Sequence, residues 1–136
     1  MRSVETDWWV LDLPDEWEAE QDEETIVIGD EDGVGAVEIS TLRKHEDDGA
    51  VDLKHLAGEL IPAPQPGRPV QLAGLEALYF QYREEGEAVR EWLVDGGGLL
   101  LLISYSCAVE NAGLDDGVVD DILDTLQLKL EDEGAA

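Results

Sequence analysis

Basic residues are scarce in this sequence, and their scarcity restricts the partners that the protein can have. Eight Lys and Arg stand against 34 Asp and Glu, which gives a formal net charge of -26. Nucleic acid and anionic membrane surfaces should be repelled by this charge, so we expect neither as a partner. A saline habitat would explain the acidic surplus, and so would a well-solvated surface in ordinary cytosol. Net charge does not separate the two, because it reports on solubility rather than on fold.

Cysteine and long apolar runs are also scarce. Cys107 is the only cysteine, so no intrachain disulfide can form and nothing indicates an oxidising compartment. The longest apolar run, Leu99 to Ile103, is far too short to span a bilayer. Glu5 and Asp7 interrupt the N-terminal stretch where a signal peptide would need apolar residues. We therefore expect a cytoplasmic protein.

The residues of common catalytic and metal sites are few and do not form motifs. His45 and His55 are the only histidines, and no G-x-S-x-G elbow accompanies them. The acidic stretch Asp30–Asp32 lacks the downstream oxygen ligands of a calcium loop, and no Gly-Lys-Ser/Thr follows a glycine-rich segment. We interpret Cys107 as a small buried hydrophobe. The sequence predicts no catalytic residue, no metal site and no cofactor.

What the sequence does contain is the pattern of one α+β domain over residues 1–136. A hydrophobic fraction of 43% in 136 residues suits a single domain with its own core. Period-two alternation predicts a twisted antiparallel sheet of about six strands, and period 3.6 predicts helices near 50–60 and 116–130 that pack against it. The expected strands are 8–13, a short one from Trp17, 25–29, 34–44, 75–83, 88–94 and 99–107. A proline-rich connector, 62–69, joins two strand-rich halves, and the tail 131–136 should be frayed.

One stretch, LYFQYREEGEAVREWLV (residues 78–94), gathers half of the eight aromatic residues and two of the basic ones. A two-residue turn at Glu85-Gly86 would pair Gln81 with Arg90 and Tyr79 with Trp92. Since side chains alternate across a strand, the hairpin then has two faces. One face carries Ala77, Tyr79, Gln81, Arg83, Ala88, Arg90, Trp92 and Val94. The other carries Leu78, Phe80, Tyr82, Val89, Leu93 and Glu91, and we expect it to face the core.

The mixed face is our candidate binding surface. Tyr79, Gln81, Arg83, Arg90 and Trp92 combine aromatic, amide and guanidinium groups, which is the composition of binding hot spots. A cationic island in an acidic shell would orient an acidic partner. Reversing the charge of both arginines should then abolish binding and leave the fold intact. The structural alternative is a cross-strand aromatic pair whose neighbouring arginines neutralise glutamates.

Two segments of the chain resemble the PsbP-like superfamily. LDLPDEWEAEQDEETIVIGDEDGVGAVEIS, with Pro14 and Trp17, is similar to its opening, where proline and then tryptophan lead into a strand pair. REWLVDGGGLLLLISYSC and the helix after it resemble its closing hairpin and helix. The resemblance covers most of the chain and implies an antiparallel sheet with helices packed against it.

The functions of that superfamily imply a role in protein binding. Its members include an extrinsic photosystem II protein, a nuclear-transport factor that binds the Ran GTPase, and bacterial adaptor-chaperones. The chain shows no lumen-targeting segment, which argues against the photosynthetic role. We therefore predict a non-enzymatic binding module of adaptor or chaperone type, whose partner is a protein with an acidic segment. The alternative is a small-ligand-binding or enzymatic domain with a pocket between sheet and helix, which a deep pocket containing His45, His55 or Cys107 would favour.

Overall fold

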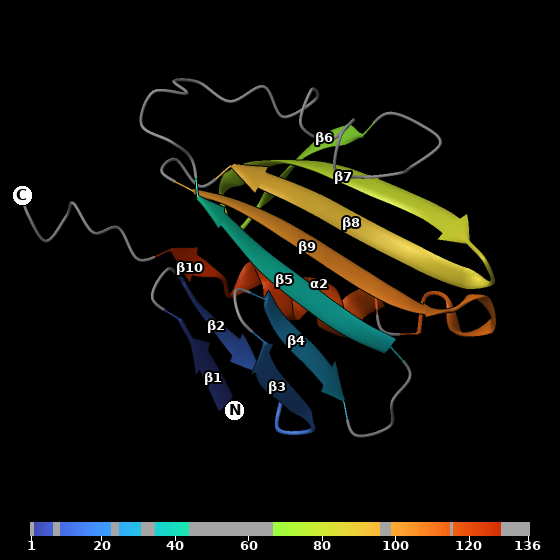
Figure 1. Ribbon diagram of the computed structural model, residues 1–136, viewed down its shortest axis with the longest axis horizontal. Coiled ribbons are helices and arrows are strands. Elements are labelled where there is room, and N and C mark those ends of the chain that lie inside the picture. The colour runs from blue at the N-terminus through green and yellow to red at the C-terminus, as the bar shows by residue number, and fades with distance from the viewer. Residues whose placement is uncertain are drawn as a thin grey trace, which may run out of the picture.

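The computed structural model describes residues 2–6, 9–22, 25–30, 35–43, 67–95, 99–114 and 116–128. Its main element is a seven-stranded antiparallel sheet in the order β3-β4-β5-β9-β8-β7-β6 (Figure 1). The strands of this sheet are β3 (Trp17–Asp22), β4 (Thr25–Asp30), β5 (Gly35–Arg43), β6 (Arg68–Leu72), β7 (Leu75–Glu84), β8 (Glu87–Asp95) and β9 (Leu99–Ala108). A three-stranded sheet in the order β1-β2-β10 contains β1 (Arg2–Glu5), β2 (Trp9–Leu13) and β10 (Gln127–Leu128). In the described ranges the helical segments are η2, a 3-10 turn (Val109–Asn111), and α2, an α-helix (Asp116–Asp124).

The α+β class expected from the sequence is confirmed, but the proportions differ. The large sheet has seven strands rather than about six, and a second sheet is present. The expected helix near 50–60 and the tail 131–136 lie outside the described residues. Within the described ranges no helix combines the length and the apolar character that crossing a membrane requires.

The main core lies between one face of the large sheet and the layer formed by α2 and the small sheet. Figure 1 shows α2 passing behind β5, on that side of the sheet. Trp9 and Leu11 of β2, and Val119 of α2, are fully buried there. The indole Nε1 of Trp9 donates a hydrogen bond of 3.0 Å to Thr41 Oγ1, which satisfies a polar atom inside this core.

Strand β9 lies at the centre of the large sheet, as its unbroken apolar run predicts. Its residues Leu101 and Ile103 are fully buried on the side of α2, and Leu100 is 7% exposed on the other side. Cys107, also on β9, is a buried free thiol, which confirms its interpretation as a small hydrophobe.

The hairpin of β7 and β8 has the register that the sequence predicts. Tyr79 pairs with Trp92, and Gln81 pairs with Arg90. The turn residues Glu85 and Gly86 have φ values of 50° and 86°. Two successive positive φ angles characterise the two-residue turns that match the twist of a hairpin.

The hairpin face that we expected to be core is buried, but it is not the face that α2 covers. Trp92 and Val94 belong to the main core, together with α2, so the mixed face points toward the helix. The face with Leu78, Phe80 and Leu93 forms a second, smaller cluster on the opposite side of the sheet. Both faces are apolar enough to be buried, and the hairpin's own sequence does not reveal which one the helix covers.

Strand β6 replaces the end of the expected connector. Residues 62–66 lie outside the described residues, but Arg68 and Pro69 already belong to β6. Proline cannot donate to a sheet ladder and is therefore tolerated mainly on edge strands, and β6 is at the edge of the described sheet. The turn between β6 and β7 is Ala73-Gly74, in which Ala73 has an unusual φ of 52°.

The last helix is shorter than its apolar periodicity predicts. It ends at Asp124, and the chain continues as β10, in which Gln127 pairs with Val10 of β2. The Thr125 hydroxyl accepts a hydrogen bond of 2.9 Å from the backbone N–H of Asp12, which joins the end of the helix to β2. Pairing with β2 therefore replaces the last expected turns of helix.

Candidate functional site

The charged residues of strands β6, β7 and β8 are sorted by face. The registers place Arg68, Arg83 and Arg90 on the face toward α2. All acidic residues of these three strands alternate onto the opposite face: Glu76, Glu84, Glu87, Glu91 and Asp95. We call the first surface the arginine face and define it as Arg68, Tyr79, Gln81, Arg83, Arg90 and Trp92. In a chain of net charge -26, this separation creates a local excess of positive charge.

One half of the arginine face is covered by α2. Trp92 is 5% exposed, and the Arg90 side chain is 13% exposed. The Arg90 guanidinium lies over the Trp92 ring, with its Cζ 4.7 Å from the ring centroid. Its Nη2 lies 2.9 Å from Asp120 Oδ1, and its Nη1 lies 3.4 Å from Asp116 Oδ1. Arg90 therefore links the first turns of α2 to the sheet.

Tyr79 joins the covered half to the exposed half. Its ring centroid lies 5.2 Å from that of Trp92, and its hydroxyl accepts a 2.8 Å hydrogen bond from Arg90 Nε. On its other side, the Cζ of Arg68 lies 5.5 Å from the Tyr79 ring centroid. Cation–π contacts of this kind restrain both guanidinium groups. The aromatic pair of the structural alternative is thus present, but Arg90 is neutralised by aspartates of α2 rather than by glutamates.

The exposed half consists of Arg68, Gln81 and Arg83, with Tyr79 partly exposed. Neither Arg68 nor Arg83 forms an ion pair with any residue that the structure describes. Gln81 and Arg83 contribute to a shallow depression of about 340 Å³ at the end of the hairpin. The residues that line it are Gln81, Tyr82, Arg83, Ala88 and Ala112.

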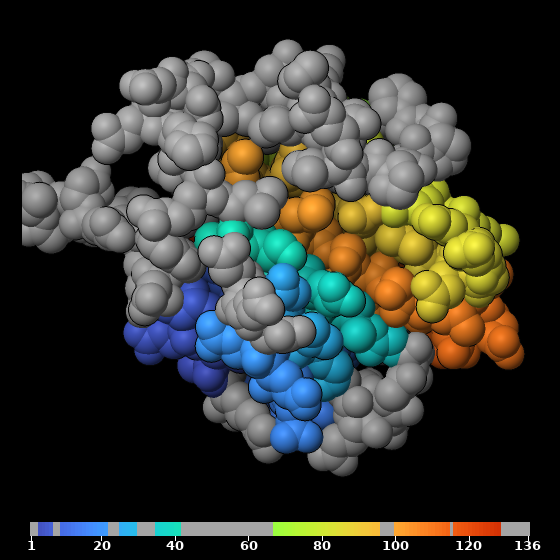
Figure 2. Space-filling model, viewed as in Figure 1, coloured from blue at the N-terminus to red at the C-terminus, as the bar shows by residue number. Residues whose placement is uncertain are grey.

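The segment that closes this depression comes from the chain after β9. Figure 2 shows the β7–β8 hairpin and the end of β9 with η2 side by side at one end of the molecule. The backbone N–H of Val109 donates a hydrogen bond of 3.0 Å to the carbonyl of Gly86, which holds the two together. Leu114, two residues beyond Ala112, is 67% exposed and is the one exposed large hydrophobic side chain in the described part of the chain.

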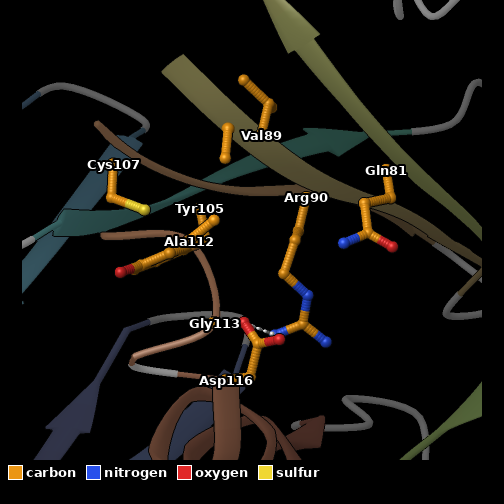
Figure 3. Close-up of a pocket in the computed structure, with 9 residues that line it drawn as sticks. Gln81, Val89, Arg90, Tyr105, Cys107, Ala112, Gly113 and Asp116 are labelled. Carbon is orange, nitrogen blue, oxygen red and sulfur yellow. Dashed lines mark hydrogen bonds and ion pairs between the residues drawn. The ribbon is translucent and has the colours of Figure 1, made fainter. Parts of the chain in front are cut away.

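The space between the sheet and the start of α2 is almost filled. Figure 3 shows Arg90 reaching from β8 to Asp116, with Cys107 and Tyr105 on the neighbouring strand. The cavity that these residues line has a volume of about 20 Å³. That is room for roughly one water molecule. The described residues around Cys107 therefore line only this small cavity and no deep ligand pocket. His45 and His55 lie outside the described residues.

Two titratable groups lie together on the opposite face of the sheet. Glu91 is 7% exposed, and its carboxylate accepts a hydrogen bond from the Tyr82 hydroxyl. Burial raises the pKa of Glu91, and the nearby Glu84 carboxylate adds to the rise, while the bond from Tyr82 opposes it. Burial also raises the pKa of Tyr82, and the hydrogen bond to Glu91 and the negative charge of Glu91 raise it further. This pair is a source of pH-dependent stability, and its neighbours Leu78, Phe80 and Leu93 are apolar.

All five residues predicted to bind a partner lie on one face of the sheet, but their side chains are not equally exposed. Gln81 and Arg83 are exposed, Tyr79 is intermediate, and Arg90 and Trp92 are covered by α2. Arg68 escaped the prediction because the strand that carries it was interpreted as a connector. Among the described residues, no three His, Cys, Asp or Glu side chains are grouped as metal ligands would be.

Comparisons with known proteins identify the fold. No protein-family model matches the chain, and a search of curated proteins found no match. A Bacteroides thetaiotaomicron protein of known structure is 18% identical, with a TM-score of 0.70, and the match covers 91% of this chain. The chain spans 46% of that protein's length. The cyanobacterial PsbP (CyanoP) of Synechocystis is 11% identical, with a TM-score of 0.62 over 89% of this chain and 86% of that one.

The chain has a PsbP-like fold. The resemblance expected from the sequence is confirmed at the level of the fold. A further structure with this likeness is LpqN of Mycobacterium tuberculosis, which is involved in cell envelope biogenesis. It is 16% identical, with a TM-score of 0.55 over 90% of this chain and 83% of LpqN. At such identities a PsbP-like fold carries no particular activity with it.

Proposed function

We propose that this chain is a non-enzymatic, cytoplasmic protein-binding module of adaptor or chaperone type. Its contact surface is the exposed half of the arginine face. The observation that supports this is the sorting of charge on β6–β8, which leaves Arg83 exposed and without an ion pair to any described residue. In a protein with so many carboxylates, a surface arginine would ordinarily be expected to form ion pairs with neighbouring glutamates. Arginine beside aromatic and apolar groups is typical of interaction sites.

Affinity capture from the cell's own lysate tests this proposal. Arg83→Gln removes one positive charge from the arginine face, and Gln71→Glu adds one negative charge on the opposite face of β6. Both variants therefore have a net charge of -26 - 1 = -27. They differ in the position of the changed charge and not in net charge. We expect a protein enriched by the wild type to be kept by Gln71→Glu and lost by Arg83→Gln. Equal capture by both variants would refute this location of the contact surface.

Charge reversal at Arg90 is a poor test of binding. A glutamate at this position would lie against Asp116 and Asp120, and three carboxylates together would repel α2. Loss of binding would then reflect loss of the helix. The original expectation that both arginines could be reversed in an intact fold therefore does not suit Arg90, and the test rests on Arg83.

The alternative function, binding of a small ligand, has the open depression in its favour. Its volume of about 340 Å³ is at the lower limit for ligand pockets, although it is shallow and its walls come from five residues. If no protein is enriched from the lysate, a small carboxylate at Arg83 becomes the better hypothesis. Shifts in the NMR signals of Gln81, Ala88 and Ala112 on adding such compounds would then identify it.

A further inference from the structure

We infer that the arginine face binds an extended acidic segment of a partner, with two carboxylates four residues apart. The inference rests on the proposed function and specifies the chemistry of the partner. Its basis is the spacing of the two exposed arginines. Arg68 is aligned with Tyr79, and Tyr79 is four residues from Arg83 along β7. At about 3.4 Å per residue, the two arginines stand roughly 14 Å apart along the strand direction.

An extended peptide has the same rise, and its residues i, i+2 and i+4 point to one side. Carboxylates at i and i+4 would therefore meet Arg68 and Arg83 together, and the side chain at i+2 would lie over Gln81. In an α-helix the same two carboxylates would be only about 6 Å apart along the axis, too close to reach both arginines. The face thus selects an extended conformation.

The contact is made by side chains across the sheet, not by an added strand. Between Leu75 and Tyr79, β7 is paired with β6 on one side and with β8 on the other, and from Phe80 to Glu84 it is paired with β8. A strand added beyond Tyr79 would therefore lie past the end of β6, whereas side chains that cross the face can meet both arginines. Arg68 is held over the Tyr79 ring, which reduces the conformational entropy lost when it binds a carboxylate. The exposed Leu114 and the depression beside Arg83 would receive an apolar residue beyond the second carboxylate.

The charge of the whole molecule favours a short acidic segment over nucleic acid. Two carboxylates bring two negative charges, and both are placed against arginines. A nucleic acid carries about one charge per 1.7 Å, most of which would face the acidic remainder of the surface. At physiological salt the screening length is about 8 Å, so contacts within the arginine face outweigh the distant acidic residues.

Direct binding of synthetic peptides tests the inference. Two fluorescent peptides of identical composition, rich in Thr and Val, would carry two glutamates either four residues apart or adjacent. Anisotropy titrations at about 50 mM salt should show the wild type binding the spaced peptide at least about threefold more tightly. Arg68→Gln and Arg83→Gln should each weaken that binding by about three- to fivefold, which is the effect of one exposed ion pair. The double variant should lose the preference for spacing, whereas Gln71→Glu should keep it.

Equal affinity of the wild type for the two peptides would overturn the inference, and so would an unchanged preference in the double variant. Tighter binding of a single-stranded oligonucleotide of the same charge would also overturn it. These outcomes are separate from failure of the proposed function. A partner captured through Arg83 would stand even if the spacing had no effect, and spaced-peptide binding without any captured partner would leave the adaptor role unsupported.

Discussion

Of the carboxylates described on β6–β8, Glu91 has the environment that differs most from the others. It is buried at 7% exposure on the apolar side of the hairpin, while Glu76, Glu84 and Glu87 are exposed. A carboxylate in such a place is disfavoured by the loss of hydration, and the Tyr82 hydroxyl compensates only in part. The residue therefore lowers the stability of the fold at neutral pH relative to a neutral analogue.

We predict that Glu91→Gln stabilises the protein, and more so as pH rises. The pKa of Glu91 is raised above its ordinary value of 4.5 in the fold, so the folded state binds its proton more strongly than the unfolded state does. The resulting stabilisation is complete below the unfolded pKa and is lost as pH rises through the folded pKa. Glutamine keeps an oxygen that accepts the Tyr82 bond and has no titration. Urea unfolding of both proteins between pH 4 and 8 would measure this, and curves that stay parallel would contradict it.

At the scale of elements, α2 depends on the sheet for its place more than on its own sequence. It has nine residues, and its buried side chains are Val119, Ile122 and Leu123. Helices this short are marginal in isolation, so packing provides most of their stability. Arg90 adds a polar anchor through Asp116 and Asp120, in the first turns of the helix.

We predict that Arg90→Ala lowers the stability by about 2 kcal/mol, since it removes two partly exposed ion pairs, a cation–π contact and the packing of the side-chain stem. For a domain of this size that is a fall in Tm of roughly 8 °C. Arg83→Ala removes the same charge from an exposed position and should change the stability by less than about 0.5 kcal/mol. Thermal unfolding followed by circular dichroism compares them, and equal melting of the two variants would argue against the anchoring role of Arg90.

The elements that the sequence predicted well are those with local signals. Glu85-Gly86 set the register of β7 and β8, and the apolar run at 99–103 identified the central strand. β6 was missed because its only turn signal is Ala73-Gly74, in which alanine takes a conformation that normally favours glycine or asparagine. The early end of α2 was missed because its cause, pairing of β10 with β2, joins residues more than 100 positions apart. The predicted register grouped the residues of the candidate surface on one face, but which half α2 covers depends on tertiary packing.

At the scale of the whole molecule, the net charge of -26 opposes the compact state. Repulsion among exposed carboxylates acts over a range of about 30 Å at 0.01 M salt and about 8 Å at 0.15 M. Arg90 and its aspartates are partly shielded from solvent, so salt weakens them less than it weakens the repulsion.

We therefore predict that the protein becomes more stable as NaCl is raised, with most of the gain below about 0.2 M. The free energy of unfolding in urea at a series of NaCl concentrations measures this. KCl at equal ionic strength should have the same effect, because screening does not depend on the identity of the ion. A gain seen with sulfate but not with chloride would instead indicate exclusion of the salt from the protein surface.

The sorting of acidic and basic residues between the two sides of β6–β8 has a consequence for how another molecule approaches. It gives this part of the protein an electric dipole directed across the thickness of the sheet, with its positive end at Arg68 and Arg83. The two ends are separated by about 10 Å, which is close to the screening length in physiological salt. An acidic partner is therefore repelled by the protein as a whole at long range. It interacts appreciably with the dipole only at short separations. Orientation is selected at that final step, so encounters with the acidic side separate before any close contact forms.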